Sequence, residues 1–329
     1  MARRTRPTAQ QLIDGVTAGD RAVLARAITL AESQRDEDRA LVQDALSSLY
    51  ERTGKSHRVG ITGVPGVGKS SFIETFGSML TREGHRVAVL AVDPSSARSG
   101  GSILGDKTRM QRLARDPNAF IRPSPSSGTL GGVARHTREA MLLCEAAGFD
   151  IIVVETVGVG QSEAMVARIV DSFLVLMLSG AGDELQGIKR GILELADVLA
   201  VNKADGDNLE PARRARLDLR AAFIYMLEKT PGWKVPVLTC SAHTGEGIEE
   251  VWQALQAHRQ HLRKTGAWEQ DRQKQRVYWF WRTVEAQLAA AFRADPNVAQ
   301  ATSSIEEGVR TGALSPERAA EQLLAHYRR

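Results

Sequence analysis

The spacing of hydrophobic and polar positions divides the chain into three parts. Up to about residue 53, apolar positions recur at helical spacing, as in Val23, Leu24, Ala27 and Ile28 on the inner side of one predicted helix. From there to about residue 240, short β-rich runs alternate with helical segments, and after about Thr265 the pattern is helical again. We therefore predict three domains: an N-terminal helical extension at 1–57, a central α/β domain at 58–264 and a C-terminal helical arm at 265–329.

The central part contains six short runs of the composition that is typical of strands. They are RVGIT at 58–62, RVAVLAV at 86–92, DIIVVET at 150–156, FLVLMLS at 173–179, DVLAVN at 197–202 and VPVLTC at 235–240. Near-continuous apolar strands that alternate with helices predict a mostly parallel sheet covered on both faces. Ligands of such sheets bind at the carboxyl ends of the strands, and the motifs considered below all follow strand ends.

Capping signals place the ends of several helices. Thr8 with Gln11 three residues later resembles a capping box, and Asp20 can cap a second helix. A third helix is predicted from about Asp36 to Tyr50. In the C-terminal arm, the run WEQDRQKQRVYWFWRTVEAQLAAAF is long and amphipathic, and the pair Ser315 and Pro316 can begin a last helix.

Composition and charge exclude several classes of protein. Hydrophobic residues make up 43% and charged residues 25%, as in ordinary globular proteins, and no apolar run approaches the length of a membrane span. The net charge of +4 comes from basic residues that alternate with acidic ones, so we expect neither a nucleic-acid nor a membrane partner. The only two cysteines, Cys144 and Cys240, lie far apart, and no secretory signal is present, which indicates a reduced, cytoplasmic protein.

The stretch GVPGVGKS at 63–70 matches the phosphate-binding loop pattern G-x-x-x-x-G-K-[ST], follows a strand and opens an apolar helix. Its glycines let backbone N–H groups face phosphate oxygens, Lys69 would reach the β- and γ-phosphates, and Ser70 would bind Mg²⁺. A glycine-rich turn without a ligand is the alternative. We assign phosphate binding to Gly63, Val64, Pro65, Gly66, Val67, Gly68, Lys69, Ser70 and Ser71. The expected fold is thus an α/β P-loop domain with N-terminal and C-terminal helical extensions.

A second motif, NKAD at 202–205, follows a later strand and predicts guanine recognition. Asp205 would accept hydrogen bonds from N1–H and the 2-amino group, Asn202 would hold the 6-oxo side and the loop itself, and the stem of Lys203 would cover the ring. Adenine lacks that pair of donors, so it would leave the carboxylate unpaired. In CSAHTGEG at 240–247, Ser241 and Ala242 can place a backbone N–H on the base oxygen. We therefore expect GTP and GDP as ligands.

Three acidic residues lie where a magnesium site needs oxygen ligands. Asp93 ends a strand, Asp106 lies in a Gly- and Ser-rich loop, and Glu155 ends another strand at a place where most GTPases have aspartate. Simpler interpretations exist, since Asp93 with Pro94 can form a turn and Asp106 can cap a helix.

Six stretches together resemble the MeaB/ArgK/MMAA family of SIMIBI-class P-loop GTPases. They are GVPGVGKS, DPSS, GDKTRM, ETVGVGQSE, GAGDELQGIK and NKAD, and the resemblance runs from about Gln10 to the C-terminus. It implies a GTPase that is slow alone, is stimulated by adenosylcobalamin-dependent methylmalonyl-CoA mutase, gates loading of the cofactor and protects or reactivates the mutase. It also implies that Asp93, Asp106 and Glu155 belong to the shell of Mg²⁺ and water, and that Lys69 acts with them in hydrolysis.

Two further implications of the resemblance concern partners. The GAGDELQGIK segment would be a switch that contacts the mutase, and its polar residues Asp183, Glu184, Gln186 and Lys189 would couple nucleotide state to the partner. The helical C-terminus would form a homodimer. The aromatic run VYWFW at 277–281 supports this expectation, because a short helical tail cannot bury such side chains by itself.

Three other functions compete with this interpretation. A P-loop kinase for a small molecule would need an acceptor pocket and usually a lid. A nickel- or cobalt-delivering GTPase calls for clustered Cys and His, whereas His258 and His261 have no acidic or thiol companions nearby and are predicted to form a solvated face. A signal-recognition-type GTPase would carry a Met-rich or strongly basic domain, and the seven methionines here are scattered.

Overall fold

The computed structural model describes residues 6–33, 35–93, 110–125, 130–156, 162–180, 190–224, 226 and 228–327. The chain divides into two compact units, Met1–Trp268 and Glu269–Arg329. No helix in the described ranges is long and apolar enough to cross a bilayer.

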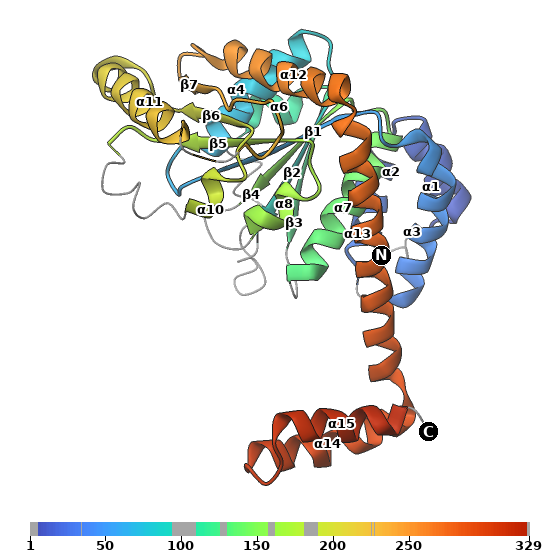
Figure 1. Ribbon diagram of the computed structural model, residues 1–329. Coiled ribbons are helices and arrows are strands. Elements are labelled where there is room, and N and C mark those ends of the chain that lie inside the picture. The colour runs from blue at the N-terminus through green and yellow to red at the C-terminus, as the bar shows by residue number, and fades with distance from the viewer. Residues whose placement is uncertain are drawn as a thin grey trace. The chain divides into compact units, whose positions relative to one another are not determined.

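A seven-stranded sheet forms the centre of the first unit (Figure 1). Its strands are β1 His57–Gly63, β2 Val87–Asp93, β3 Ala119–Pro125, β4 Ile151–Thr156, β5 Ser172–Met177, β6 Val198–Val201 and β7 Val237–Thr239. They lie in the order β3-β2-β4-β1-β5-β6-β7, and all six strand pairs are parallel. The expected parallel sheet is confirmed, and the carboxyl ends of all its strands face one edge.

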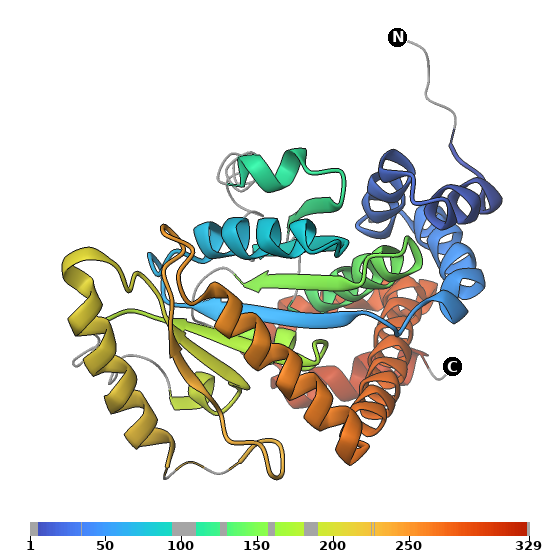
Figure 2. The same cartoon turned by 90° about the horizontal axis from the view of Figure 1, so that it is seen from above.

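Helices cover both faces of the sheet (Figure 2). On one face, α4 Lys69–Arg82, α6 Gln111–Arg115 and α12 Ile248–Thr265 share a buried cluster with Val59 and Ile61 of β1. On the other face lie α7 Leu130–Ala146 and α8 Ser162–Ala167, and Gly60 of β1 points toward Val166 of α8. This alternation of neighbouring residues is what a strand buried on both faces requires. The structure also describes α10 Arg190–Leu193, the 3₁₀ helix η2 Gly206–Asn208 and α11 Leu209–Phe223 in this region.

Within residues 6–33 and 35–49, the described chain forms three helices, α1 Ala9–Thr17, α2 Arg21–Ala31 and α3 Asp36–Leu49, and the 3₁₀ helix η1 Tyr50–Arg52 follows. The predicted capping box is present, with Thr8 Oγ1 accepting from the Gln11 N–H and Gln11 Oε1 accepting from the Thr8 N–H. Asp20 caps α2 as predicted. These helices pack on each other and on α7, so they extend the helical layer on that face of the sheet.

Strand β3 has no counterpart among the predicted strands, and its two prolines explain why. Pro123 and Pro125 lack an N–H and are unusual in a strand that is paired on both sides. Among the strands that the structure describes, β3 lies at the edge of the sheet and pairs only with β2. The carbonyl of Asn118 faces β2, where it accepts from Val87 N at 2.9 Å, so odd-numbered residues of β3 turn their amide positions to the open edge. Both prolines therefore occupy positions that make no ladder hydrogen bond.

The expectation that His258 lies on a solvated helix face is wrong. Its side chain is 1% exposed, and its Nδ1 lies 2.9 Å from the hydroxyl of Ser172. The same hydroxyl lies 2.9 Å from His57 Nε2, and Asp197 Oδ1 lies 3.5 Å from His258 Nε2. Ser172 and Asp197 stand at the amino ends of β5 and β6, where they supply polar partners inside the protein. Helical spacing alone could not reveal partners that come from distant strands.

The second unit is helical. It contains most of α13 Ala267–Ala294 together with α14 Pro296–Arg310 and α15 Pro316–Tyr327, which begins at the predicted proline. α14 and α15 pack against each other, and Asp295 caps α14. Val277, Phe280 and Trp281 of the VYWFW run are each more than half exposed.

Candidate nucleotide-binding site

Those predicted motifs that the structure describes meet at the carboxyl edge of the sheet. β1 leads into the loop at 63–68, β4 ends beside Glu155, β6 leads into Asn202, and β7 leads into Ser241. β1 lies between β4 and β5 in the sheet, so the phosphate-loop strand is flanked by the strand that carries Glu155. Motifs that are up to 178 residues apart in sequence, from Gly63 to Ser241, are thus brought to one edge.

The loop at 63–68 has the backbone of a phosphate cradle. Gly66 and Gly68 have φ values of 80° and 90°, a conformation that favours glycine. A Cβ at Gly66 would meet nothing within 4 Å, whereas one at Gly63 would lie 2.5 Å from the carbonyl oxygen of Leu176. Gly63 is therefore required because the loop packs closely against β5 at this position. At Gly66 the space beside the loop is open. The loop ends at the N-terminus of α4, which offers free N–H groups and a positive dipole to an anion.

Lys69 begins α4 and turns back over this loop. Its Nζ donates to the carbonyl oxygens of Gly63 at 2.8 Å and Val64 at 3.4 Å. Burial lowers the pKa of Lys69, and the nearby carboxylates of Glu155 and Glu163 oppose that effect. The ammonium group is thus held in place, while its positive charge is only partly balanced by nearby carboxylates. Such a group can bind a negatively charged phosphate.

This environment predicts that GDP binding takes up protons at alkaline pH. Phosphate charge raises the pKa of Lys69 in the complex, so between the lowered pKa of the free protein and the ordinary value of 10.5 the complex holds more protons. GDP affinity should therefore fall several-fold as pH rises through the lowered pKa of Lys69. Calorimetry in buffers of different ionisation enthalpy measures the uptake. The Lys69→Arg variant, which stays charged, should show none of this uptake, and equal uptake in both proteins would contradict the assignment.

Ser70 and Glu155 are brought together as a magnesium site requires. Ser70 Oγ donates to Glu155 Oε1 at 3.3 Å, and Glu155 is only 5% exposed. A hydroxyl and a carboxylate at the start of a phosphate-binding helix are hard oxygen donors, so these two residues fit Mg²⁺. Asp93 ends β2, but its side chain lies outside the described atoms, and Asp106 lies outside the described residues.

The chain that leads away from Asp106 is anchored by a residue that the motifs did not reveal. Glu74 of α4 is 7% exposed, and its carboxylate accepts from the backbone N–H groups of Arg112 at 2.8 Å and Leu113 at 3.3 Å. These N–H groups stand in the first turn of α6, where a carboxylate is stabilising. The buried Met110 precedes them. The helix that begins at Lys69 therefore also fixes the end of the segment that carries Asp106.

A second unpredicted contact joins the two strand ends nearest the phosphate loop. Thr156 Oγ1 donates to Thr62 Oγ1 at 2.7 Å, and both side chains are fully buried. Thr62 precedes Gly63, and Thr156 follows Glu155. This hydrogen bond fixes Glu155 relative to the phosphate loop. Only the parallel pairing of β1 with β4 brings these two threonines together, so no sequence motif could indicate the contact.

Asn202 links the guanine motif to the phosphate loop. It is fully buried, and its Nδ2 donates to the carbonyl of Val67 at 2.8 Å. Its Oδ1 accepts from the N–H of Ala242 at 3.1 Å. The Asn202 amide therefore joins the phosphate loop, through Val67, to the segment after β7, through Ala242. The N–H of Ala242, which the sequence offered to the base oxygen, is here directed to Asn202.

Asp205 is held by the side chain of Ser241, a contact that the sequence motifs did not predict. Ser241 Oγ donates to Asp205 Oδ2 and accepts from the N–H groups of His243 at 3.2 Å and Thr244 at 3.1 Å. Lys203 has a φ of 61°, and its Cε lies 3.9 Å from the position of a Cβ built on Gly68. Its side chain therefore extends from the base motif toward the phosphate loop, and the arrangement can hold a guanine beside Asp205.

Asp183, Glu184, Gln186 and Lys189 lie outside the described residues. Ser71, the last residue of the predicted phosphate-binding set, is in the first turn of α4 and is exposed.

Comparisons with known proteins agree with this arrangement. A family model described as methylmalonyl Co-A mutase-associated GTPase MeaB matches residues 24–297. The methylmalonic aciduria type A homolog, mitochondrial, of Mus musculus is 47% identical over 328 residues, which cover 97% of this chain and 79% of that protein. The GTPase ArgK of Escherichia coli K12 is 46% identical over 316 residues, or 96% of both chains. A solved structure described as LAO/AO transport system kinase is 38% identical, with a TM-score of 0.75 and full coverage of both chains.

Proposed function

This chain belongs to the MeaB family of GTPases, and from that membership we propose that it hydrolyses GTP to GDP and phosphate and acts as a chaperone of methylmalonyl-CoA mutase. The observation that carries the proposal is the family match over residues 24–297, which includes every motif of the nucleotide site. The convergence of the phosphate loop, Glu155 and the NKAD motif at one sheet edge supports it.

Within this proposal each part of the site has a distinct task. The N–H groups of the loop and Lys69 bind the phosphates, while Asp205 selects guanine. Mg²⁺, when bound, would supply charge that stabilises the transferring phosphoryl group, and Ser70 and Glu155 would hold it together with Asp93 and Asp106. Glu155, one methylene longer than the usual aspartate, would reach a metal-bound water from its strand end and report the nucleotide state to the chain after Thr156.

The partner in the proposal is an adenosylcobalamin-dependent mutase. GTP binding and hydrolysis would gate loading of the cofactor and protect or reactivate the mutase. The description of the family model and the name of the mouse relative support this role. We further propose a cytoplasmic homodimer joined through the C-terminal helices, where Val277, Phe280 and Trp281 are exposed.

The proposal predicts that methylmalonyl-CoA mutase raises the GTP turnover of this protein by roughly tenfold or more, because partner contacts order the residues around the γ-phosphate. Turnover is measured as phosphate release with and without saturating mutase. The Lys189→Ala variant should keep basal turnover within a few-fold and lose most of the stimulation. Lys264→Ala, an exposed lysine on α12, is the matched control. If Lys189→Ala is stimulated as strongly as Lys264→Ala, the coupling runs through another segment.

One comparison favours a second candidate, a P-loop kinase. The solved structure that covers the whole chain is described as a transport system kinase. GTP labelled on the γ-phosphate separates the two functions, since a GTPase transfers the label to water and a kinase transfers it to an acceptor molecule. Label that appears only as inorganic phosphate, in the presence of candidate amino-acid acceptors, would exclude the kinase.

A further inference from the structure

A pocket lies at the edge of the sheet that is farthest from β3, away from the nucleotide site. It has a volume of about 590 Å³ and is lined by the end of α11, the segment at 228–236 and β7. We call it the α11 pocket. Its lining includes residues at the amino ends of β6 and β7, whereas Asn202 and Ser241 follow the carboxyl ends of the same two strands. Its volume is in the range of sites that bind small organic molecules, about 300–1,000 Å³.

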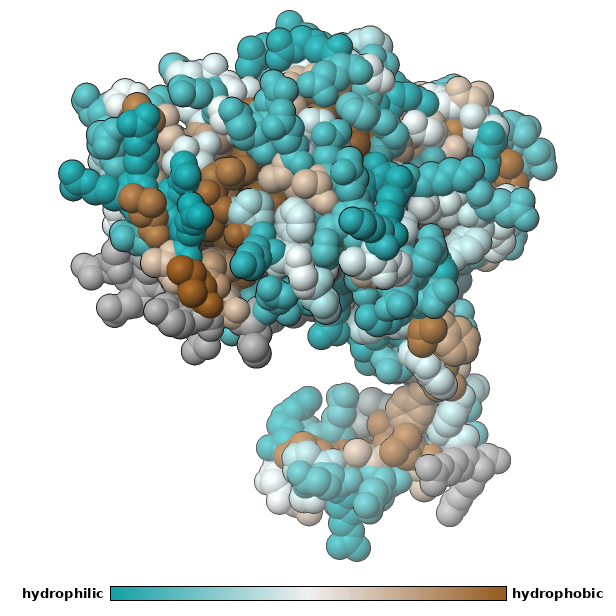
Figure 3. All heavy atoms as spheres, turned by 45° about the horizontal axis from the view of Figure 1, so that its top comes forward, coloured by the Kyte–Doolittle hydropathy of each residue, from teal (hydrophilic) through white to brown (hydrophobic). Residues whose placement is uncertain are grey.

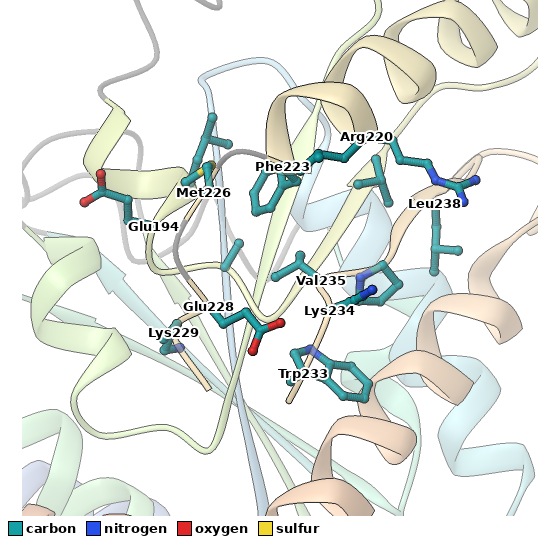
Figure 4. A pocket seen from close by; sticks show the side chains of 15 residues that line it. Glu194, Arg220, Phe223, Met226, Glu228, Lys229, Trp233, Lys234, Val235 and Leu238 are labelled. Atoms are coloured by element: carbon teal, nitrogen blue, oxygen red, sulfur yellow. The ribbon is translucent and has the colours of Figure 1, made fainter. Parts of the chain in front are cut away.

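The lining of the α11 pocket is mainly apolar. Phe223, Met226, Val235 and Leu238 contribute to it, as do Ala196 and several other side chains. Figure 4 shows the ring of Phe223 and the side chains of Met226 and Val235 around its centre. Figure 3 shows hydrophobic surface gathered on the side of the molecule where α11 and β7 lie, and Ile224, another lining residue, is 74% exposed. An exposed apolar hollow of this kind favours a ligand with an apolar body.

The charged residues of the pocket are unevenly engaged. Lys229 is bound to Asp197 at 2.7 Å and to the carbonyl of Leu195 at 2.9 Å, and Glu228 accepts from the N–H of Gly232 at 2.8 Å. By contrast, Arg220 and Lys234 form no ion pair with the part of the chain that the structure describes.

Arg220 and Lys234 share one side of the pocket. In Figure 4, Arg220 and Lys234 lie on the same side as Leu238, while Glu194 and Lys229 lie on the opposite side. The charged side chains on the Leu238 side are thus Arg220 and Lys234. The carboxylate of Glu228 also faces the centre of the pocket, where it accepts from the Gly232 N–H. Positive charge beside an apolar surface complements a molecule that carries a negative group next to an apolar body.

We propose that the α11 pocket binds a small amphipathic organic anion, with its carboxylate or similar group at Arg220 and Lys234 and its apolar body against Phe223 and Met226. The site is separate from the nucleotide site, because neither the phosphate loop nor the NKAD motif contributes to its lining. Guanine nucleotide binding therefore provides an independent check that each variant is folded.

The test compares two probes that share an apolar tail and differ in charge. Decanoate and decyltrimethylammonium are titrated below their micelle concentrations, with tryptophan fluorescence as the signal, since Trp233 lines the pocket, and calorimetry as a check. Decanoate should bind about tenfold more tightly than the cation, because two surface charges act on it. The double variant Arg220→Glu/Lys234→Glu should invert this preference while GDP affinity stays unchanged.

A matched control separates a local effect from a change in net charge. Arg214 on α11 and Lys264 on α12 are exposed and lie outside the pocket, so Arg214→Glu/Lys264→Glu should keep the preference for decanoate. Phe223→Ala should weaken both probes by a similar factor. Equal affinity for the two probes, a preference for decanoate that survives the Arg220/Lys234 reversal, or binding of neither probe would overturn the proposal.

Discussion

The Asp205→Asn substitution is expected to weaken GDP and GTP binding by roughly 100-fold or more and to make xanthine nucleotides the preferred ligands. Asp205 offers guanine two charge-assisted hydrogen bonds, and their loss corresponds to about 3 kcal/mol. Xanthine carries an oxygen where guanine carries the 2-amino group, so an amide N–H can pair with it. Competition binding of GDP and xanthosine diphosphate measures the change.

The contacts of Ser241 explain why an amide at position 205 would present its NH₂ group to the base. The oxygen of Ser241 already accepts from the N–H groups of His243 and Thr244, so its hydroxyl hydrogen is directed to residue 205. The amide oxygen of the Asp205→Asn variant would accept that hydrogen, which leaves its NH₂ group facing the ligand. The double variant Asp205→Asn/Ser241→Ala should lose much of the gain for xanthine. Unchanged GDP affinity in Asp205→Asn would show that Asp205 does not read the base.

The features that were predictable from the sequence depend on neighbours in the chain. The phosphate loop, the capping box at Thr8 and the apolar strand runs each occupy a few consecutive residues, and the structure places all three as expected. β3 was not predictable in this way, because Pro123 and Pro125 argue against a strand until its edge position is known. Local patterns identify the elements, whereas the tolerance of an element for proline depends on its place in the sheet.

The contacts that organise the site depend on residues that are distant in the sequence. Glu74 anchors α6, Thr156 bonds Thr62, and Asn202 bonds the loop at Val67, and each pair is separated by more than 35 residues. Their residue types carry no signature, since a buried Glu on α4 resembles any helical glutamate in the sequence. The buried pair of His57 and His258 was hidden for the same reason, because its bridging hydroxyl comes from β5. The sequence could thus name the groups that would touch nucleotide, but not those that hold them.

Among the residues that hold the nucleotide-binding loops in place, Asn202 provides the strongest test. Asn202→Ala should lower the free energy of unfolding by roughly 2–4 kcal/mol, because it removes two buried hydrogen bonds and leaves a small cavity. It should also weaken GDP binding by about 100-fold, since the phosphate loop and the guanine loop are no longer held together through Val67 and Ala242. Chemical denaturation and calorimetric titration measure the two effects.

The Asn202→Asp variant distinguishes the two bonds and gives the prediction a pH dependence. Its carboxylate keeps an acceptor for the Ala242 N–H but faces the carbonyl of Val67, which the native amide met with a donor at 2.8 Å. Burial and that carbonyl should raise the pKa of the new carboxyl group, and its protonated form can donate to Val67. GDP affinity should therefore recover by about tenfold between pH 8 and pH 5.5 in Asn202→Asp, whereas Asn202→Ala should follow the pH dependence of the unmutated protein. If Asn202→Asp shows no recovery at low pH, the donor to Val67 is not what joins the two loops. The contact between the Thr75 hydroxyl and the Ala242 carbonyl, at 2.7 Å, would then be the next to test.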